Sequence, residues 1–505
     1  MSEKKEKLLK ELYNMTREAT ILGSCQAVLD WDERTYMPRG GAENRANMIS
    51  LIAGLVHEKI TSPRIGEIIG ELWGDGIDPN EDSIDAANLR ELKRDYDLNV
   101  KIPRSLVEEL SKTVTLAQGK WQEARAKSDF KAFLPWFEKV VDLKRQVAEA
   151  LGYEGKPYNA MLDIFEPGAT TDDIAETFAG LRNELVKLLE KIESSGKKPD
   201  TSIITRDYPI DRQKEFGIEA SKAIGFDYGG GRLDETVHPF CTGFGPGDTR
   251  ITTRYDKNHF PGAFFGILHE SGHGIYDQGL LADHYGTPLG ESISLGIHES
   301  QSRMWENMVG RSKAFWKHFF PKAQKTFPDA LGKVSMEQFY FAVNDVRPSF
   351  IRVESDEATY NLHILLRFEI ESAFFNGDLP LKDVPHVWNE KFEKYFGIKP
   401  PDDAQGCLQD VHWSGGLIGY FPTYSLGNLY AAQFFAHADQ ELGGLHAQFE
   451  KGDFKPLLDW LRKNIHNHGR RYRATDLVKK VTGQPLTHKP LIDYMTKKFG
   501  ELYGF

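Results

Sequence analysis

The stretch PGAFFGILHESGHGIYDQG, residues 261–279, largely decides how the surrounding chain folds. Pro261 suits the first turn of a helix, where its missing N–H leaves no hydrogen bond unmade. Gly279 stands where a helix can end, because glycine readily adopts the backbone conformation of a helix terminus. Between these two residues, an apolar stripe at helical spacing is formed by Phe264, Phe265, Leu268 and Ile275. We therefore predict a helix across this stretch.

The same stretch contains two histidines, His269 and His273, four residues apart. On a helix this spacing places both imidazoles on one face, one turn apart. Two neutral imidazoles in this arrangement can bind one Zn²⁺ at about 2.0–2.1 Å. Glu270 follows the first histidine, so it lies near the metal and can take a proton from the metal-bound water. The motif predicts a zinc-dependent peptidase.

Two glycines in the predicted helix, Gly272 and Gly274, lower its propensity by up to about 1 kcal/mol each. Glycine at these positions could instead allow a second helix to pack closely against the first. The next stretch with a helical pattern is Leu295–Trp305, and we predict the second helix there.

A catalytic zinc needs a third protein ligand and one open position for water. The carboxylates of Glu291, Glu299 and Glu306 lie on or beside the second predicted helix, and spacing does not choose among them. Adjacent residues on a helix point about 100° apart, so we do not expect His298 and Glu299 to bind the same ion. A packing role, or a hydrogen bond to a ligand, is favoured for His298.

Apolar residues at helical spacing predict helices through most of the remaining chain. The predicted helices cover residues 4–31, 42–72, 85–100, 103–151 and 171–194, and helices resume near residue 261 and continue to the C-terminus. The helix at 171–194 opens with a Thr-Thr-Asp-Asp start signal, typical of a helix N-terminus.

Glycine is dense between residues 225 and 256, which predicts a β-rich insert. Arg250–Tyr255 alternates and is β-branched, so it is predicted as a strand, with Val237–Thr242 as a possible neighbour. Gly415–Gly427 is a second stretch predicted as a loop. We expect a single catalytic domain over residues 1–505, two-lobed, with the insert near 225–256.

Composition excludes several classes of protein. The chain of 505 residues has a net charge of -11, which argues against a nucleic-acid binder. No run of about 18 apolar residues is present, so no membrane span or membrane partner is expected. The start lacks the apolar stretch of a signal peptide, and the three cysteines are widely separated. These observations predict a cytoplasmic protein.

Several short motifs occur in an order that identifies a family. These are WDERTYMP at 31–38, HPF at 238–240, DTR at 248–250, HESGH at 269–273, HESQ at 298–301, IRVESD at 351–356, GCLQDVHW at 406–413 and FPTYSLGN at 421–428. With them the chain resembles the Taq-type metallocarboxypeptidases, thermostable zinc carboxypeptidases of prokaryotes, over nearly its whole length. Ser355 departs from the family pattern, which usually has alanine there.

The resemblance implies a gluzincin-like fold: a mainly α, large helical body with a deep active-site cleft and a small β-sheet on its rim. It implies Glu299 as the third metal ligand, with one zinc per subunit and cobalt able to substitute. It also implies a homodimer that hydrolyses the C-terminal peptide bond of peptides with broad specificity, acting poorly near proline.

The resemblance also assigns roles to residues beyond the metal. The negative charge of the tetrahedral intermediate needs hydrogen-bond donors, and His412, Tyr420 and Tyr424 are the candidates, with the choice between the tyrosines left open. Arg352 is the candidate for binding the substrate carboxylate, since arginine pairs bidentately with carboxylates. An ion pair of Arg352 with Glu354 or Asp356 is the structural alternative.

Four further residues have weaker assignments. His238 and Arg250 resemble a pair that lines the substrate cleft in the family, and local structure in the sheet is their alternative. Asp277 could orient a ligand imidazole, although an ordinary exposed helix carboxylate is favoured. Trp31 and Asp32 match the family without evident chemistry, so we interpret them as structural.

Two other functions remain as alternatives. A zinc oligopeptidase or dipeptidase would share the metal site but not the carboxylate-binding arginine. A non-catalytic metal-binding protein is a different class, and Glu270 argues against it, because structural zinc sites fill all four positions and need no base.

Overall fold

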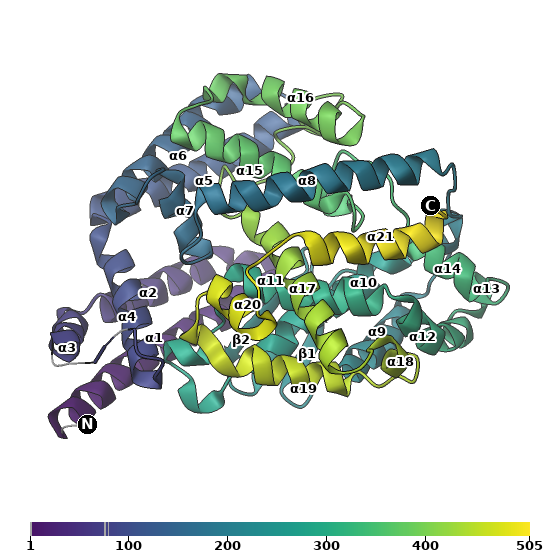
Figure 1. The fold of residues 1–505 in the computed structure, drawn as a ribbon. Helices are drawn as coiled ribbons and strands as arrows, with labels where there is room; N and C mark the ends of the chain where they lie inside the picture. The colour runs from purple at the N-terminus through teal and green to yellow at the C-terminus, as the bar shows by residue number, and fades with distance from the viewer. Residues whose placement is uncertain (1–2, 75–76, 79) are drawn as a thin grey trace. The chain divides into compact units, whose positions relative to one another are not determined.

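The computed structural model describes residues 3–74, 77, 78 and 80–505, and most of these are helical, with one three-stranded sheet (Figure 1). This arrangement confirms the predicted mainly α fold class. None of the helices in the described residues is both long enough and apolar enough to cross a membrane.

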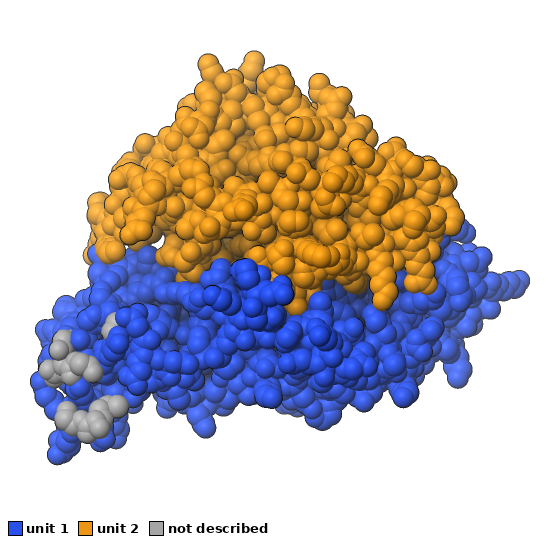
Figure 2. Space-filling model, viewed as in Figure 1, with its two compact units in different colours: residues 1–100, 200–343, 434–485 blue, residues 101–199, 344–433, 486–505 orange. Residues whose placement is uncertain are grey.

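The chain divides into two compact units, which Figure 2 colours blue and orange. Unit 1 consists of residues 1–100, 200–343 and 434–485, and unit 2 of residues 101–199, 344–433 and 486–505. The helices α4 (Ile84–Lys101) and α17 (Pro422–Glu441) each contain a boundary between the units.

The other elements of unit 1 are helices and the three strands. Its helices are α1 (Glu3–Thr35), α2 (Ala42–Ile60), α3 (Pro63–Gly74), α9 (Ile210–Ile224), α10 (Phe260–Asp277), α11 (Leu295–Arg303), the π-helix η5 (Met304–Gly310), α12 (Lys313–Thr326), α13 (Pro328–Leu331), α14 (Met336–Val343), α18 (His446–Phe449), α19 (Lys455–Asn464) and α20 (Ala474–Thr482). Its strands are β1 (Gly231–Glu235), β2 (Cys241–Gly245) and β3 (Asp248–Thr253).

Unit 2 contains helices and short 3-10 turns. Its helices are α5 (Arg104–Lys127), α6 (Phe130–Leu151), α7 (Tyr158–Phe165), α8 (Thr171–Ser194), α15 (Tyr360–Asn376), α16 (Val384–Phe396) and α21 (Lys489–Tyr503). The C-terminal helix α21 lies beside α8, although the two are far apart in the sequence (Figure 1). The core of this unit includes Phe137 stacked on Trp413, with ring centroids 5.3 Å apart.

Two of the predicted helical stretches are each split in the structure. The stretch 42–72 ends its first helix at Ile60, because proline at position 63 cannot continue it and instead begins α3. The stretch 103–151 is interrupted at Ser128, whose left-handed φ of 53° ends α5. Asp129 then caps α6 by accepting a hydrogen bond from the amide of Ala132.

The predicted loop at Gly415–Gly427 is wrong in its second half. The helix α17 begins at Pro422, a residue whose fixed φ suits the first turn of a helix. Tyr424 therefore lies in the first turn of a helix, whereas Tyr420 lies in the irregular segment before it. In contrast, the predicted helix 171–194 matches α8, and Thr170 caps it through the amide of Asp173.

The sheet has the strand order β1-β3-β2. The strand β3 pairs in parallel with β1 and antiparallel with β2. β3 and β2 lie close to the predicted strands, whereas β1 was not predicted, because its sequence GRLDE is short and mostly charged. Helix α10 packs against this sheet at Gly274, where a β-carbon would lie 3.3 Å from a methyl carbon of Ile251.

Helix α10 also packs closely against α11, as the glycines in its sequence led us to expect. A β-carbon on Gly272 would lie 2.6 Å from the Cα atom of Ser302, so only glycine fits there. On its apolar face, α10 packs Phe264 against Phe216 of α9 and Trp316 of α12, with ring centroids 5.3 Å apart in both cases. The core of unit 1 therefore fixes the position of α10, and the close contact at Gly272 fixes α11 against it.

Candidate active site

Helices α10 and α11 bring three of the predicted site residues together in unit 1. Single ligand atoms of His269, His273 and Glu299 all lie within 4.8 Å of one another. The Nε2 atom of His273 is 3.5 Å from Oε2 of Glu299, and the Nε2 atom of His269 is 3.8 Å from the same oxygen. Both imidazoles therefore direct the same kind of nitrogen toward one carboxylate oxygen.

These distances fit a metal ion. Two ligands bound to one zinc at about 2.0–2.2 Å in tetrahedral geometry lie about 3.3–3.6 Å apart. The distances from the Glu299 oxygen to His273 and His269, 3.5 and 3.8 Å, are close to this value. Two imidazoles and one carboxylate also leave a fourth position of a tetrahedron open, which is the arrangement of catalytic rather than structural zinc sites.

The other nitrogen of each imidazole has a partner, which fixes the orientation of its ring. Nδ1 of His269 lies 2.9 Å from Oε2 of Glu306. Nδ1 of His273 lies 2.5 Å from Nδ1 of His298, whose Nε2 lies 3.0 Å from Oδ1 of Asp277. The Nε2 atoms are therefore the ones available to a metal ion.

These contacts change the interpretation of Asp277 and give partners to Glu306 and Glu291, which spacing had left open as metal ligands. Asp277 is not an ordinary exposed carboxylate, because its side chain is 20% exposed and contacts His298, which in turn contacts His273. Glu306 contacts the outer nitrogen of His269 and is not one of the three residues with converging ligand atoms. Glu291 is held by Arg470 at 3.0 Å instead.

Arg303 connects the two carboxylates around His269. Its Nε atom donates to Oε1 of Glu299 at 2.6 Å, and its NH1 atom donates to Oε2 of Glu306 at 3.3 Å. Burial acts to raise the pKa of both carboxyl groups, but the Arg303 guanidinium and His269 hold each pKa well below its usual range. Both groups are therefore carboxylates at neutral pH, as metal binding and a hydrogen bond to an imidazole require.

Glu270 lies on α10 between the two histidines and is buried. Burial raises the pKa of its carboxyl group to about 7, which suits a general base at neutral pH. Burial also lowers the pKa of His273 to about 4, so this imidazole is neutral and able to bind a metal.

The two cleft-lining candidates near the sheet, Arg250 and His238, differ in their contacts and in their exposure. Arg250 pairs with its neighbour Asp248 through two hydrogen bonds of 2.9 Å. Its guanidinium lies 4.3 Å from the ring centre of Trp31 and 4.7 Å from that of Phe244. His238, in contrast, is exposed in the segment between β1 and β2. Local contacts therefore hold the guanidinium of Arg250 in place, and Trp31 packs against it.

Asp32, the residue after Trp31, also has a structural contact. Its Oδ2 atom accepts a hydrogen bond of 2.6 Å from Arg45, which joins α1 to α2.

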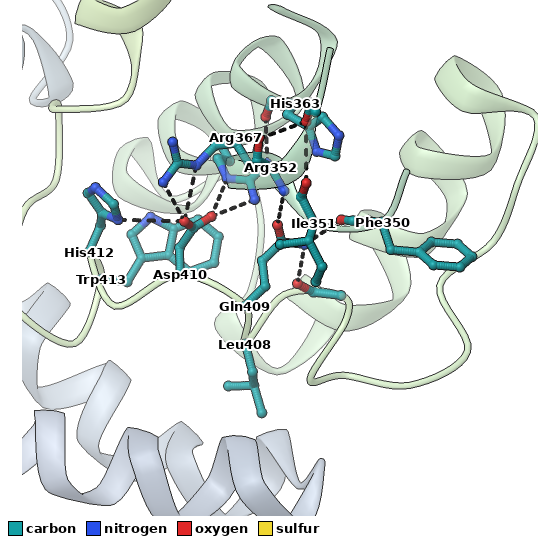
Figure 3. Close-up of polar contacts among 12 residues, drawn as sticks. Phe350, Ile351, Arg352, His363, Arg367, Leu408, Gln409, Asp410, His412 and Trp413 are labelled. Atoms are coloured by element: carbon teal, nitrogen blue, oxygen red, sulfur yellow. Dashed lines mark hydrogen bonds and ion pairs between the residues drawn. The ribbon is translucent and has the colours of Figure 1, made fainter. Parts of the chain in front are cut away.

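Unit 2 holds the remaining predicted site residues, and Figure 3 shows the cluster around Arg352. Nε and NH2 of Arg352 donate to Oδ1 of Asp410 at 3.1 and 2.8 Å. The structural alternative, an ion pair of Arg352 with Glu354 or Asp356, is therefore wrong, because the carboxylate that Arg352 contacts is that of Asp410. Asp356 instead accepts hydrogen bonds from the amides of Ala358 and Thr359, in the turn that precedes α15.

His412 and both tyrosines lie close to Arg352. The His412 ring centre is 5.5 Å from that of Tyr420 and 6.4 Å from that of Tyr424. The Arg352 guanidinium lies 5.2 Å from the ring centre of Tyr424. Burial lowers the pKa of His412 to about 4, so the imidazole is neutral and offers one N–H donor.

Two charged residues of this cluster were not assigned from the sequence. Asp410 lies in the motif at 406–413 and also accepts a hydrogen bond of 2.7 Å from Nε of Arg367. Arg367 is fully buried on α15. The sequence did contain a signal for this pair, because Arg367 lies within the apolar run LHILLRFEI, residues 362–370. A cation buried in such a run requires a buried partner of opposite charge.

Comparison with known proteins extends these observations. A sequence model described as carboxypeptidase Taq (M32) metallopeptidase matches residues 11–499. Thermostable carboxypeptidase 1 of Thermus thermophilus is 47% identical over 510 residues, covering 99% of each chain. Carboxypeptidase 1 of Bacillus subtilis is 41% identical, covering 98% of each chain. The crystal structure of an M32 carboxypeptidase from Deinococcus radiodurans superposes with a TM-score of 0.95 at 39% identity, covering 99% of this chain and 100% of that one.

Proposed function

Since the chain belongs to the carboxypeptidase Taq (M32) family of metallopeptidases and is thus a metallocarboxypeptidase, we propose that it is a zinc enzyme that removes C-terminal residues from peptides. In this proposal its specificity is broad, and it acts poorly near proline. The observation that carries the proposal is the convergence of His269, His273 and Glu299 beside the buried Glu270.

We propose that His269, His273 and Glu299 bind one zinc per subunit, and that cobalt can take its place. When bound, the metal supplies a Lewis acid and lowers the pKa of water at the open position. Two nitrogens and one oxygen are a donor set that suits zinc and its neighbours among the transition metals. The contacts at both Nδ1 atoms support this assignment, since they leave the Nε2 atoms directed at one point.

Glu270 is the proposed general base. Its carboxylate takes the proton of the attacking water and later passes it to the leaving amine. Burial of Glu270 supports the role, because a base with a pKa near neutrality can both accept and release the proton.

Arg352 is the proposed receptor for the C-terminal carboxylate of the substrate. Asp410 occupies the edge of the guanidinium formed by Nε and NH2. The proposed place for a bidentate carboxylate is the edge formed by NH1 and NH2, where NH1 also donates to the hydroxyl of Tyr360 at 3.3 Å. We propose His412, Tyr420 and Tyr424 as donors to the oxyanion of the intermediate, with His412 and Tyr424 preferred. Their gathering around Arg352 supports this grouping.

Several finer proposals complete this function. The chain works as one two-lobed catalytic domain with a β-rich insert, and as a homodimer, which light scattering of the purified protein would test. His238 and Arg250 lie near the substrate and limit its length. A cytoplasmic location is supported by the three cysteines, Cys25, Cys241 and Cys407, all of which are free thiols.

Timed mass spectrometry of a peptide mixture tests the proposed function. Each peptide is supplied with a free C-terminus and as its C-terminal amide, with zinc-loaded and chelator-treated protein. We expect stepwise loss of residues from the free C-terminus, no loss from the amide, and no activity after chelation. Internal cuts in both forms would instead identify an oligopeptidase and remove the role of Arg352.

A further inference from the structure

We propose that Arg367, which a substrate cannot touch, determines the specificity of this enzyme for a substrate carboxylate by setting the charge of the Arg352 cluster. This inference rests on the proposed role of Arg352 as the carboxylate receptor. It concerns unit 2 alone, and its first premise is that one carboxylate, Asp410, is shared by two arginines (Figure 3).

The sharing is nearly symmetrical. Oδ1 of Asp410 accepts from Nε and NH2 of Arg352 at 3.1 and 2.8 Å. Oδ2 accepts from Nε of Arg367 at 2.7 Å, and NH2 of Arg367 lies 2.5 Å from the same oxygen as an ion pair without the alignment of a hydrogen bond. Each arginine therefore has an oxygen of its own.

The charges of the cluster do not balance. Two guanidinium groups face one carboxylate, which leaves a net charge of +1. The nearby histidines do not change this value, because burial lowers the pKa of His412 to about 4 and holds that of His363 well below its usual range. Burial also lowers the pKa of Arg367, to about 10, which leaves it protonated at neutral pH.

The surroundings of the two arginines differ, and this difference gives them different roles. Arg367 is fully buried, donates from NH1 to the carbonyl of His363, and lies under the rings of Trp388 and Phe421. It therefore cannot contact a substrate. Arg352 is also buried, at 6% exposed, and donates from NH1 to the hydroxyl of Tyr360 at 3.3 Å, so the edge proposed for the substrate is the one formed by NH1 and NH2.

The consequence for binding follows from electrostatics. An Arg352–Asp410 pair alone would be neutral, and a carboxylate approaching Arg352 would meet Asp410 as a like charge. Arg367 neutralises Asp410, so the positive charge of Arg352 remains available to the substrate. The buried net charge is in turn compensated when a carboxylate binds.

Competitive inhibition by a matched pair of ligands tests this inference. The probes are an N-acetylated amino acid, which carries a free carboxylate, and its primary amide. The measured quantity is the ratio of their inhibition constants on the zinc-loaded enzyme. We expect the wild type to prefer the carboxylate, and Arg367→Met to lose about tenfold of that preference because the cluster becomes neutral.

A second variant separates charge from structure. In the double variant Arg367→Met/Asp410→Asn, Arg352 is again the one charge of the cluster, so the carboxylate preference should return. Arg367→Lys should retain most of it. Arg182→Met is the matched control, because Arg182 also pairs with a carboxylate within unit 2, that of Glu369 at 2.6 Å, and should leave the ratio unchanged.

Each possible result of the inhibition experiment tests the role of one residue. A wild-type enzyme that does not distinguish the carboxylate from the amide overturns the proposed role of Arg352. A wild type that distinguishes them, with an unchanged ratio in Arg367→Met, overturns the role of Arg367. A double variant that stays as poor as Arg367→Met shows that Arg367 acts only by ordering Asp410. If Arg367→Met does not fold, Arg367→Gln takes its place, because it also makes the cluster neutral and should lose the same part of the carboxylate preference.

Discussion

The two polar clusters of this protein are built with opposite charge. In unit 1, the carboxylates of Glu299, Glu306 and Asp277 outnumber the two arginines of the cluster, Arg303 and Arg311. In unit 2, two arginines share one aspartate. Buried charges of one sign are costly unless a counter-charge is present. The difference therefore supports the ligand proposed for each cluster: a cation in unit 1 and an anion in unit 2.

We expect the largest effect from a change at Glu270, because it is the proposed general base and is not one of the proposed metal ligands. Glu270→Gln should retain zinc but lose turnover by about 10²–10⁴-fold, the typical contribution of a general base. Metal content by mass spectrometry and kcat on a free peptide are the two measurements. Turnover at the wild-type rate with zinc bound would refute the base assignment.

The second effect concerns the anionic ligand of unit 2. Arg352→Ala should raise KM for peptides with a free C-terminus by about a hundredfold, since it removes a bidentate charged contact. Zinc content should not change, because the three proposed zinc ligands lie in unit 1. Hydrolysis of such peptides as efficient as that of the wild type would remove Arg352 from substrate binding.

The third prediction compares the two carboxylates that orient the proposed metal-binding histidines. Glu306→Gln should weaken zinc binding by about 10–100-fold, because Glu306 contacts the ligand His269 directly. Asp277→Asn should weaken it less, since Asp277 acts through His298. Competition titration against a zinc chelator measures both variants. Equal losses, or a larger loss for Asp277→Asn, would contradict this ranking.

The smallest effect should come from an arginine outside both clusters. Arg250 pairs with one aspartate, Asp248, so this pair has no net charge to attract a ligand. Arg250→Met should cost about 1–2 kcal/mol of folding stability through its lost ring contacts. Thermal unfolding measures this cost, and kcat/KM across peptides of increasing length measures the proposed limit on substrate size. A loss of stability without any dependence on length would leave Arg250 a structural role alone.

The parts of the site that could be predicted are those that local geometry determines. A spacing of four residues on a helix fixes the relation of His269 to His273, whatever surrounds them. Glu299 needed the family resemblance, because its distance from α10 depends on how two helices pack. The start of α17 was missed because the glycines around Pro422 resemble a loop, whereas its burial against the core favours a helix.

The partners of charged residues could not be predicted at all. Asp410 lies 58 residues beyond Arg352 in the chain, and nothing in either local sequence connects them. The contact of Glu306 with His269 likewise depends on the π-helix η5, a local departure from α-helical spacing that periodicity does not reveal. These contacts depend on tertiary packing, which single-sequence patterns do not contain.

Gly272 has a consequence for which ions this protein can hold. Its hydrogen, in place of a side chain, lets α11 approach until Ser302 is in contact, one turn beyond Glu299. The distance from His273 to the Glu299 oxygen is thereby set at 3.5 Å. That separation suits two neighbouring ligands of a small four-coordinate ion, which lie about 3.3–3.6 Å apart. The packing of two helices thus sets the spacing of the ligand atoms before any ion binds.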